Sequence, residues 1–98
     1  MEQAEVFQRL RTNQQKFEHF PIQSLAIFGS VARNEARSDS DVDILVEFTK
    51  DAHIGLFEFV RLQRLLSDIL GAPVDLATPD ALRKELREQI LAEALPVA

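Results

Sequence analysis

Apolar residues recur along this chain at two spacings, and the spacing changes from segment to segment. Over residues 2–19 they fall at roughly helical intervals, which predicts an amphipathic helix that ends before Pro21. Helical spacing also runs over 55–70, where Gly71 is a typical residue for a helix end. A four-residue apolar repeat predicts a last helix over 79–96, with a proline at its first position.

Shorter apolar runs lie between these helices. Residues 24–28, 42–48 and 73–77 have the length and composition of β-strands, and 30–34 has that of a short helix. Helices and strands thus alternate without internal repeats. The pattern predicts one domain over residues 1–98 of the α/β (α+β) class, with a small mixed β-sheet flanked by helices.

Composition narrows the function classes. The net charge of −5, with Lys and Arg scattered among the acids, argues against direct nucleic-acid binding, which needs clustered positive charge. The absence of cysteine excludes a disulfide framework and a thiolate metal site, and it fits a cytoplasmic location. No apolar stretch approaches a membrane span, and the N-terminal residues do not have the pattern of a signal peptide, so we expect no membrane association.

The most informative polar positions lie at the ends of the first two predicted strands. The first strand runs into Gly29 and Ser30, where backbone N–H groups and a hydroxyl can approach a phosphate. Ten residues separate this pair from Asp41 and Asp43, which are two positions apart. Side chains alternate across a strand, so we expect both carboxylates on one face. Like charges this close together are explained by a divalent cation between them, and Mg²⁺ prefers such oxygen ligands.

A simple turn and a calcium loop are the other interpretations of these residues. A Gly-Ser pair after a strand is most often only a turn, and a turn rich in Asp and Ser needs no metal. Asp39, Asp41 and Asp43 fall at positions one, three and five of an EF-hand loop. That loop needs a glycine where this chain has Ile44 and a glutamate where it has Lys50, so the calcium interpretation is disfavoured.

A third carboxylate lies on the third predicted strand. Asp75 has apolar neighbours on both sides, and a lone Asp in an apolar strand is costly to bury unless it is paired, hydrogen-bonded or bound to metal. We therefore expect it to join the other two.

Two stretches carry a family resemblance. Gly-Ser-Val-Ala-Arg at 29–33 and Ser-Asp-Val-Asp-Ile-Leu at 40–45 resemble the signature of the DNA polymerase β-type nucleotidyltransferase superfamily, and within it the minimal nucleotidyltransferases. Asn34 stands where that family usually has glycine. Asparagine tolerates the left-handed backbone region, so we expect the turn to survive. The resemblance implies a nucleotidyltransferase fold.

The resemblance also implies roles for the acids. Asp41, Asp43 and Asp75 would be the catalytic carboxylates and would bind two Mg²⁺ ions. Gly29, Ser30 and Arg33 would bind the nucleotide, and ATP is the expected donor.

Minimal nucleotidyltransferases imply a partner as well. The resemblance associates them with toxins of the HEPN class, in pairs where this type of chain is the antitoxin and adenylylates a tyrosine of the RNase toxin. It thus implies a Mg²⁺-dependent transfer of AMP from ATP, and a hetero-oligomer with the partner. The alternative is a non-catalytic antitoxin that neutralises its partner by binding. An aminoglycoside-modifying enzyme would need an acceptor-binding domain for which this chain has no residues to spare.

The remaining polar residues have simpler explanations. Arg33 could be a surface arginine paired with Glu35 or Glu47, and Arg37 lies outside the matched stretch. The two histidines lack metal-ligand spacing and are expected at the surface. The apolar stripe over 55–70 predicts a core helix, part of which has enough apolar positions to pack on another chain.

Overall fold

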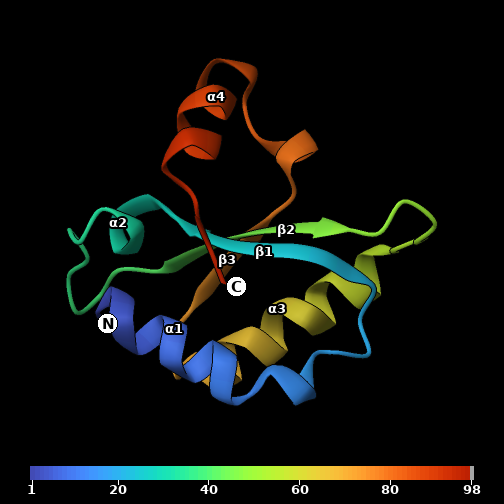
Figure 1. Cartoon of the computed structure of the whole chain (residues 1–98), viewed down its shortest axis with the longest axis horizontal. Coiled ribbons are helices and arrows are strands. Elements are labelled where there is room, and N and C mark those ends of the chain that lie inside the picture. The colour runs from blue at the N-terminus through green and yellow to red at the C-terminus, as the bar shows by residue number, and fades with distance from the viewer. Residues whose placement is uncertain (98) are drawn as a thin grey trace.

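A computed structural model describes residues 1–97 of the chain. Its centre is a four-stranded sheet with the order β3-β2-β1-β4. Figure 1 shows α1 and α3 against one face of this sheet, and α4 standing over the other. The strands are β1 (Ile22–Phe28), β2 (Val42–Phe48), β3 (Val74–Ala77) and β4 (Leu95–Pro96). The helices are α1 (Gln3–Thr12), α2 (Gly29–Ala32), α3 (Leu56–Leu70) and α4 (Lys84–Glu93), with 3₁₀ turns η1 (Gln14–Lys16) and η2 (Pro79–Ala81).

The sheet is mixed, as the sequence predicts. β1 pairs antiparallel with β2 and with β4, whereas β2 pairs in parallel with β3. The parallel pair needs a crossover, and α3 supplies it between the two strands. The α/β class with a small mixed sheet is confirmed.

The core lies between the sheet and the α1–α3 layer. Alternate strand residues such as Ile27, Ile44 and Leu76 point into it and are buried. α3 contributes a stripe at four-residue spacing, and α1 contributes Val6 and Leu10. The stripe on α3 is Leu62, Leu66 and Leu70. α3 also ends where the sequence predicts, because Gly71 takes the left-handed conformation that lets the chain turn away.

The prediction of one helix over residues 2–19 is too long. α1 stops at Thr12, and the chain then forms η1 and turns. The Asn13 side chain donates to the Arg9 carbonyl oxygen, which caps the helix end. The turn lets Phe17 and Phe20 reach the core from a different direction, and both are buried. No apolar residue lies between Leu10 and Phe17, so a continuous helix would have presented a polar turn to the core.

The bounds predicted for the last helix, 79–96, are wrong at both ends. Residues 79–81 form a 3₁₀ turn, the backbone is extended at Leu82 and Arg83, and α4 begins only at Lys84. The Thr78 side chain makes no capping hydrogen bond. Beyond α4 the chain straightens at Ala94 into β4, a strand that the sequence does not predict. β4 is held by pairing with β1, a long-range contact with no local signal.

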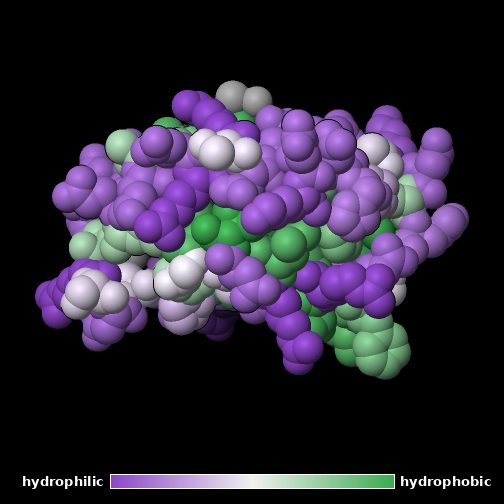
Figure 2. Space-filling model, turned by 90° about the horizontal axis from the view of Figure 1, so that it is seen from below, coloured by the Kyte–Doolittle hydropathy of each residue, from purple (hydrophilic) through white to green (hydrophobic). Residues whose placement is uncertain are grey.

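Several apolar side chains remain at the surface. Seen from the side of α1 and α3, apolar residues show between polar ones (Figure 2). At the start of α3, Leu56 and Phe57 are 75% and 86% exposed. No helix among residues 1–97 combines the length and the hydrophobicity that crossing a membrane requires.

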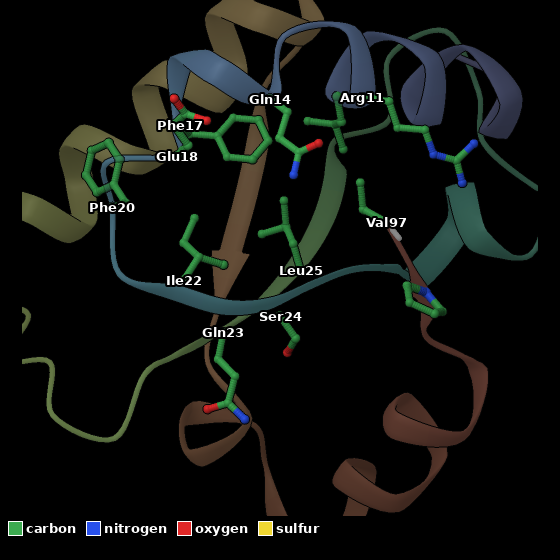
Figure 3. Close-up of a pocket in the computed structure, with 12 residues that line it drawn as sticks. Arg11, Gln14, Phe17, Glu18, Phe20, Ile22, Gln23, Ser24, Leu25 and Val97 are labelled. Carbon is green, nitrogen blue, oxygen red and sulfur yellow. The ribbon is translucent and has the colours of Figure 1, made fainter.

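A hollow of about 260 Å³ opens beside the short strand β4. Its walls come from α1, the turn after it and the first half of β1, and Figure 3 shows Phe17, Ile22 and Leu25 around it. Val97 closes one end, where its backbone N–H donates to the Leu25 carbonyl oxygen.

Candidate active site

The turn from β1 into α2 brings the backbone close to a carboxylate of the neighbouring strand. Gly29 has φ +74°, a conformation that residues with a side chain rarely adopt. A Cβ atom at this position would overlap Oδ2 of Asp43. Glycine is therefore required here twice, by its backbone angle and by the space that Asp43 occupies.

Asp43 and Asp75 are neighbours across the parallel strands. They are register partners on β2 and β3, and adjacent strands in a sheet are about 5 Å apart. The residues on either side of Asp75, Val74 and Leu76, are buried in the core. Because side chains alternate, Asp43 and Asp75 both lie on the opposite face, the face of α4 (Figure 1).

Asp41 lies just before β2 and is exposed, as Asp75 is, whereas Asp43 is half-buried between them. Burial raises the pKa of Asp43 to about 6, and the negative charges of Asp75 and then Asp41 act in the same direction. Arg33 acts in the opposite direction and lowers this pKa. The charges of the other two acids predicted from the sequence thus both act on Asp43.

These acids do not form a closed metal cage. Among residues 1–97 no three His, Cys, Asp or Glu side chains come together as a ready cluster for a metal ion. The donor set nevertheless suits Mg²⁺, which is commonly held by one or two carboxylates together with substrate phosphates. Adjacent Asp43 and Asp75 supply two such carboxylates, and Asp43, half-buried between like charges, would be stabilised by a cation.

Side chains of α3 hold the backbone next to Asp75 through hydrogen bonds. The Gln63 side chain donates to the Val74 carbonyl oxygen at 2.8 Å, and the Val74 N–H donates to Ser67 Oγ at 3.1 Å. Both sides of one β3 residue are therefore tied to the crossover helix. The apolar spacing of α3 gave no signal for these two polar residues, each of which directly follows a buried leucine of the stripe.

Ser30 follows Gly29 in the first turn of α2 and is half-buried. The turn closes with the Glu35 N–H donating to the Ser30 carbonyl oxygen at 2.8 Å. Asn34 has φ +58°, the left-handed conformation expected for a position where glycine is usual. The prediction that this turn survives with asparagine is confirmed.

Arg33 connects α2 with α4. Its Nη1 donates to Glu93 Oε1 at 3.1 Å and its Nε to Glu35 Oε2 at 3.4 Å. The alternative of an arginine paired with Glu35 is thus seen, but together with an ion pair to Glu93, which the sequence did not predict. Arg37 uses its backbone N–H to bind Ser40 Oγ.

A cleft of about 220 Å³ separates α2 from α4, and we call it the α2–α4 cleft. It reaches from the glycine turn to the Arg33–Glu93 ion pair. Its lining residues are Phe28, Gly29, Arg33, Leu86, Gln89, Ile90 and Glu93. Of the α4 members, Leu86 and Ile90 belong to the apolar repeat at four-residue spacing. That repeat indicates that the helix has an apolar side but not what this side faces.

Comparison with known proteins agrees with this geometry. The profile of the nucleotidyltransferase domain family matches residues 6–97. The chain is 38% identical over 80 residues to the protein adenylyltransferase MntA of Thermococcus cleftensis, covering 82% of this chain and 79% of that protein. The solved structure of a candidate minimal nucleotidyltransferase superposes with a TM-score of 0.80 at 36% identity, over 98% of this chain and 96% of the other.

A more distant likeness extends to a complex. A chain from the solved complex of the tri-AMPylated Shewanella oneidensis HEPN toxin with MNT antitoxin superposes with a TM-score of 0.66 at 18% identity. The match covers 98% of this chain and 71% of the other, and it supports the fold. With a family profile over nearly its whole length, this chain belongs to the nucleotidyltransferase domain family and is an enzyme of the nucleotidyltransferase type.

Proposed function

We propose that the protein is an antitoxin that transfers AMP from ATP to a tyrosine hydroxyl of a partner toxin of the HEPN class, in a Mg²⁺-dependent reaction. The observation that carries this proposal is the pairing of Asp43 with Asp75 on one face, directly against the Gly29 turn. The relative MntA is a protein adenylyltransferase, and the AMPylated HEPN toxin is bound to an MNT antitoxin. Both support the choice of nucleotide and partner.

The proposed transfer forms one bond and breaks one bond at phosphorus. The tyrosine oxygen forms a bond to the α-phosphorus of ATP, the bond between that phosphorus and the β-phosphate oxygen breaks, and pyrophosphate leaves. The hydroxyl proton passes to solvent. A tyrosine is a suitable acceptor because its pKa near 10 already lies well below that of an aliphatic hydroxyl.

Each site residue has a role in this transfer. The Gly29 turn and Ser30 would hold the β- and γ-phosphates, because backbone N–H groups and the Ser30 hydroxyl at this turn can donate to phosphate oxygens. Arg33 would supply positive charge on the same side. Asp41, Asp43 and Asp75 would hold Mg²⁺, which when bound supplies charge stabilisation for the transferring phosphoryl group and activates the attacking oxygen.

The exposure of the acids supports an acceptor on another protein. Asp41 and Asp75 are exposed, so the catalytic edge can be reached by a side chain presented on a second surface. A small acceptor would instead need an enclosing pocket beside these acids. We therefore expect the partner to bring the tyrosine to the edge of β3.

Transfer of label tests the proposal. The protein is incubated with its co-purified partner, Mg²⁺ and ATP labelled on the α-phosphate, and the partner is examined for label. We expect labelling by the wild type and none by Asp43→Asn or Asp75→Asn. Asp39→Asn is the matched control, because Asp39 is an exposed acid in the loop before the site. Equal labelling by all variants would refute the assignment of these acids.

One observation favours a second function. Leu56 and Phe57 form an apolar, strongly exposed pair at the start of α3. A non-catalytic antitoxin could bind its partner through this pair. In that case toxin neutralisation would survive Asp43→Asn and be lost in Leu56→Ser/Phe57→Ser, the reverse of what the catalytic proposal predicts.

A further inference from the structure

α4 is weakly attached to the rest of the protein. It contains no buried residue, although it is a ten-residue helix. The backbone is extended at both of its ends, at Arg83 and at Ala94. Figure 1 shows α4 standing clear of the sheet, above the face that carries the acids. A helix held so lightly can move without disrupting the core.

An ion pair joins α4 to α2. Arg33 donates to Glu93 at 3.1 Å, and the Glu93 side chain is 21% exposed. The other ion pair on this segment, Arg83 with Glu85, is local. Among the ion pairs of residues 1–97, the contact of Arg33 with Glu93 is therefore the one that fixes α4 to the nucleotide side of the molecule.

Arg33 is shared between two acids. Glu35 binds its Nε and Glu93 its Nη1, so one positive charge faces two negative charges. Both acids lie beside the turn where a triphosphate would bind, and Gly29 and Glu93 both line the α2–α4 cleft. A triphosphate carries several negative charges and is a stronger partner for a guanidinium than one carboxylate.

We propose that Glu93 and the phosphates of the nucleotide compete for Arg33, so that nucleotide binding releases α4. This inference rests on the proposed function, because it takes the Gly29 turn as the phosphate site. In the free protein Glu93 holds Arg33 and docks α4. When the phosphates attract Arg33, the ion pair opens and α4 loses its charged attachment to α2. The release uncovers the α4 wall of the cleft.

Linkage makes the effect reciprocal. If the nucleotide weakens the docking of α4, then docking weakens nucleotide binding by the same factor. Removal of the Glu93 charge should therefore tighten nucleotide binding, whereas a residue that only orients Arg33 would weaken it when removed. The sign of the change distinguishes the two roles.

Binding of a non-hydrolysable ATP analogue with Mg²⁺, measured by calorimetry, tests this sign on the full chain. We expect Glu93→Gln to bind about three- to tenfold more tightly than wild type, the size expected for one partly exposed charge. Glu88→Gln is the matched control, because it makes the same charge change on α4 at an exposed position outside the cleft. It should stay within about twofold of wild type.

Two further measurements separate the proposal from a general charge effect. In the Arg33→Ala background, Glu93→Gln should change affinity by no more than Glu88→Gln does. Amide hydrogen exchange over residues 84–93 should become faster when the analogue binds to wild type, and it should already be fast in Glu93→Gln without it.

The outcomes are distinguishable. Binding by Glu93→Gln that equals Glu88→Gln, or that is weaker than wild type, would overturn the competition between Glu93 and the phosphates while leaving the nucleotide site in place. Slower exchange in α4 on binding would also overturn it. No binding of the analogue to folded wild-type protein would refute the proposed function itself.

Discussion

Asp43 occupies the space that a side chain at Gly29 would need, so the glycine turn and the central carboxylate of the candidate site are fitted to each other. The contact joins the end of β1 to the start of β2, two strands whose register places Phe28 opposite Asp43. A change at either residue should therefore affect both stability and the site.

Gly29→Ala should destabilise the protein by about 1–3 kcal/mol, because it adds a clash with Asp43 to a positive φ angle. Urea unfolding measures the change. Gly55→Ala is the control, since a Cβ atom there would meet nothing within 4 Å and φ is −84°. It should cost less than Gly29→Ala, about 0.5–1 kcal/mol, because alanine is only a poorer N-cap residue than glycine. Equal losses in the two variants would contradict the role assigned to Asp43.

Asn34 should tolerate only residues that accept the left-handed conformation. Asn34→Ala should unfold more easily than Asn34→Gly by about 1 kcal/mol, because alanine at φ +58° carries a steric cost that glycine avoids. The difference between the two urea midpoints measures this cost directly. A comparison of two variants at one exposed position removes the contribution of the asparagine side chain itself.

The pKa of Asp43 predicts a pH-dependent stability. Its pKa rises from 3.8 to about 6 in the folded protein, so the native state binds this proton more tightly than the unfolded state does. The resulting stability is fully present below pH 3.8 and is lost as the pH rises through about 6. Asp43→Asn should therefore be more stable than wild type at pH 7.5 by about 1 kcal/mol, allowing for solvent screening.

The same difference should shrink as the pH falls below the folded pKa of Asp43. Unfolding in EDTA at pH 7.5 and at pH 4.5 checks this, with Asp68→Asn, an exposed acid on α3, as the matched control. A stability difference that stays constant between the two pH values would show that another group titrates.

Divalent ions should stabilise the protein through the same carboxylates. We expect Mg²⁺ with a non-hydrolysable ATP analogue to raise the thermal midpoint of wild type, and to raise it more at pH 8 than at pH 5.5, because protons compete for Asp43. Asp43→Asn and Asp75→Asn should lose this increase, whereas Asp68→Asn should keep it. An increase that persists in both site variants would place the ion elsewhere.

The features of this protein that depend on local spacing can be predicted from its amino-acid sequence. Glycine and serine at the end of a strand, two aspartates at alternate positions and an apolar stripe at helical spacing each impose their geometry on neighbouring residues. Strand alternation sends Asp43 and Asp75 to the face opposite the buried Val74 and Leu76, as the structure shows. The family resemblance followed from the same short stretches.

The places where segments that are distant in sequence meet become visible only in the folded chain. The register that sets Asp43 against Asp75, the pairing of β4 with β1 and the ion pair of Arg33 with Glu93 all join residues far apart in the chain. The end of α1 at Thr12 was likewise decided by the burial of Phe17 and Phe20. Helical spacing reports that a helix has an apolar face, but the partner of that face, and the charge that meets it, depend on contacts that no local pattern contains.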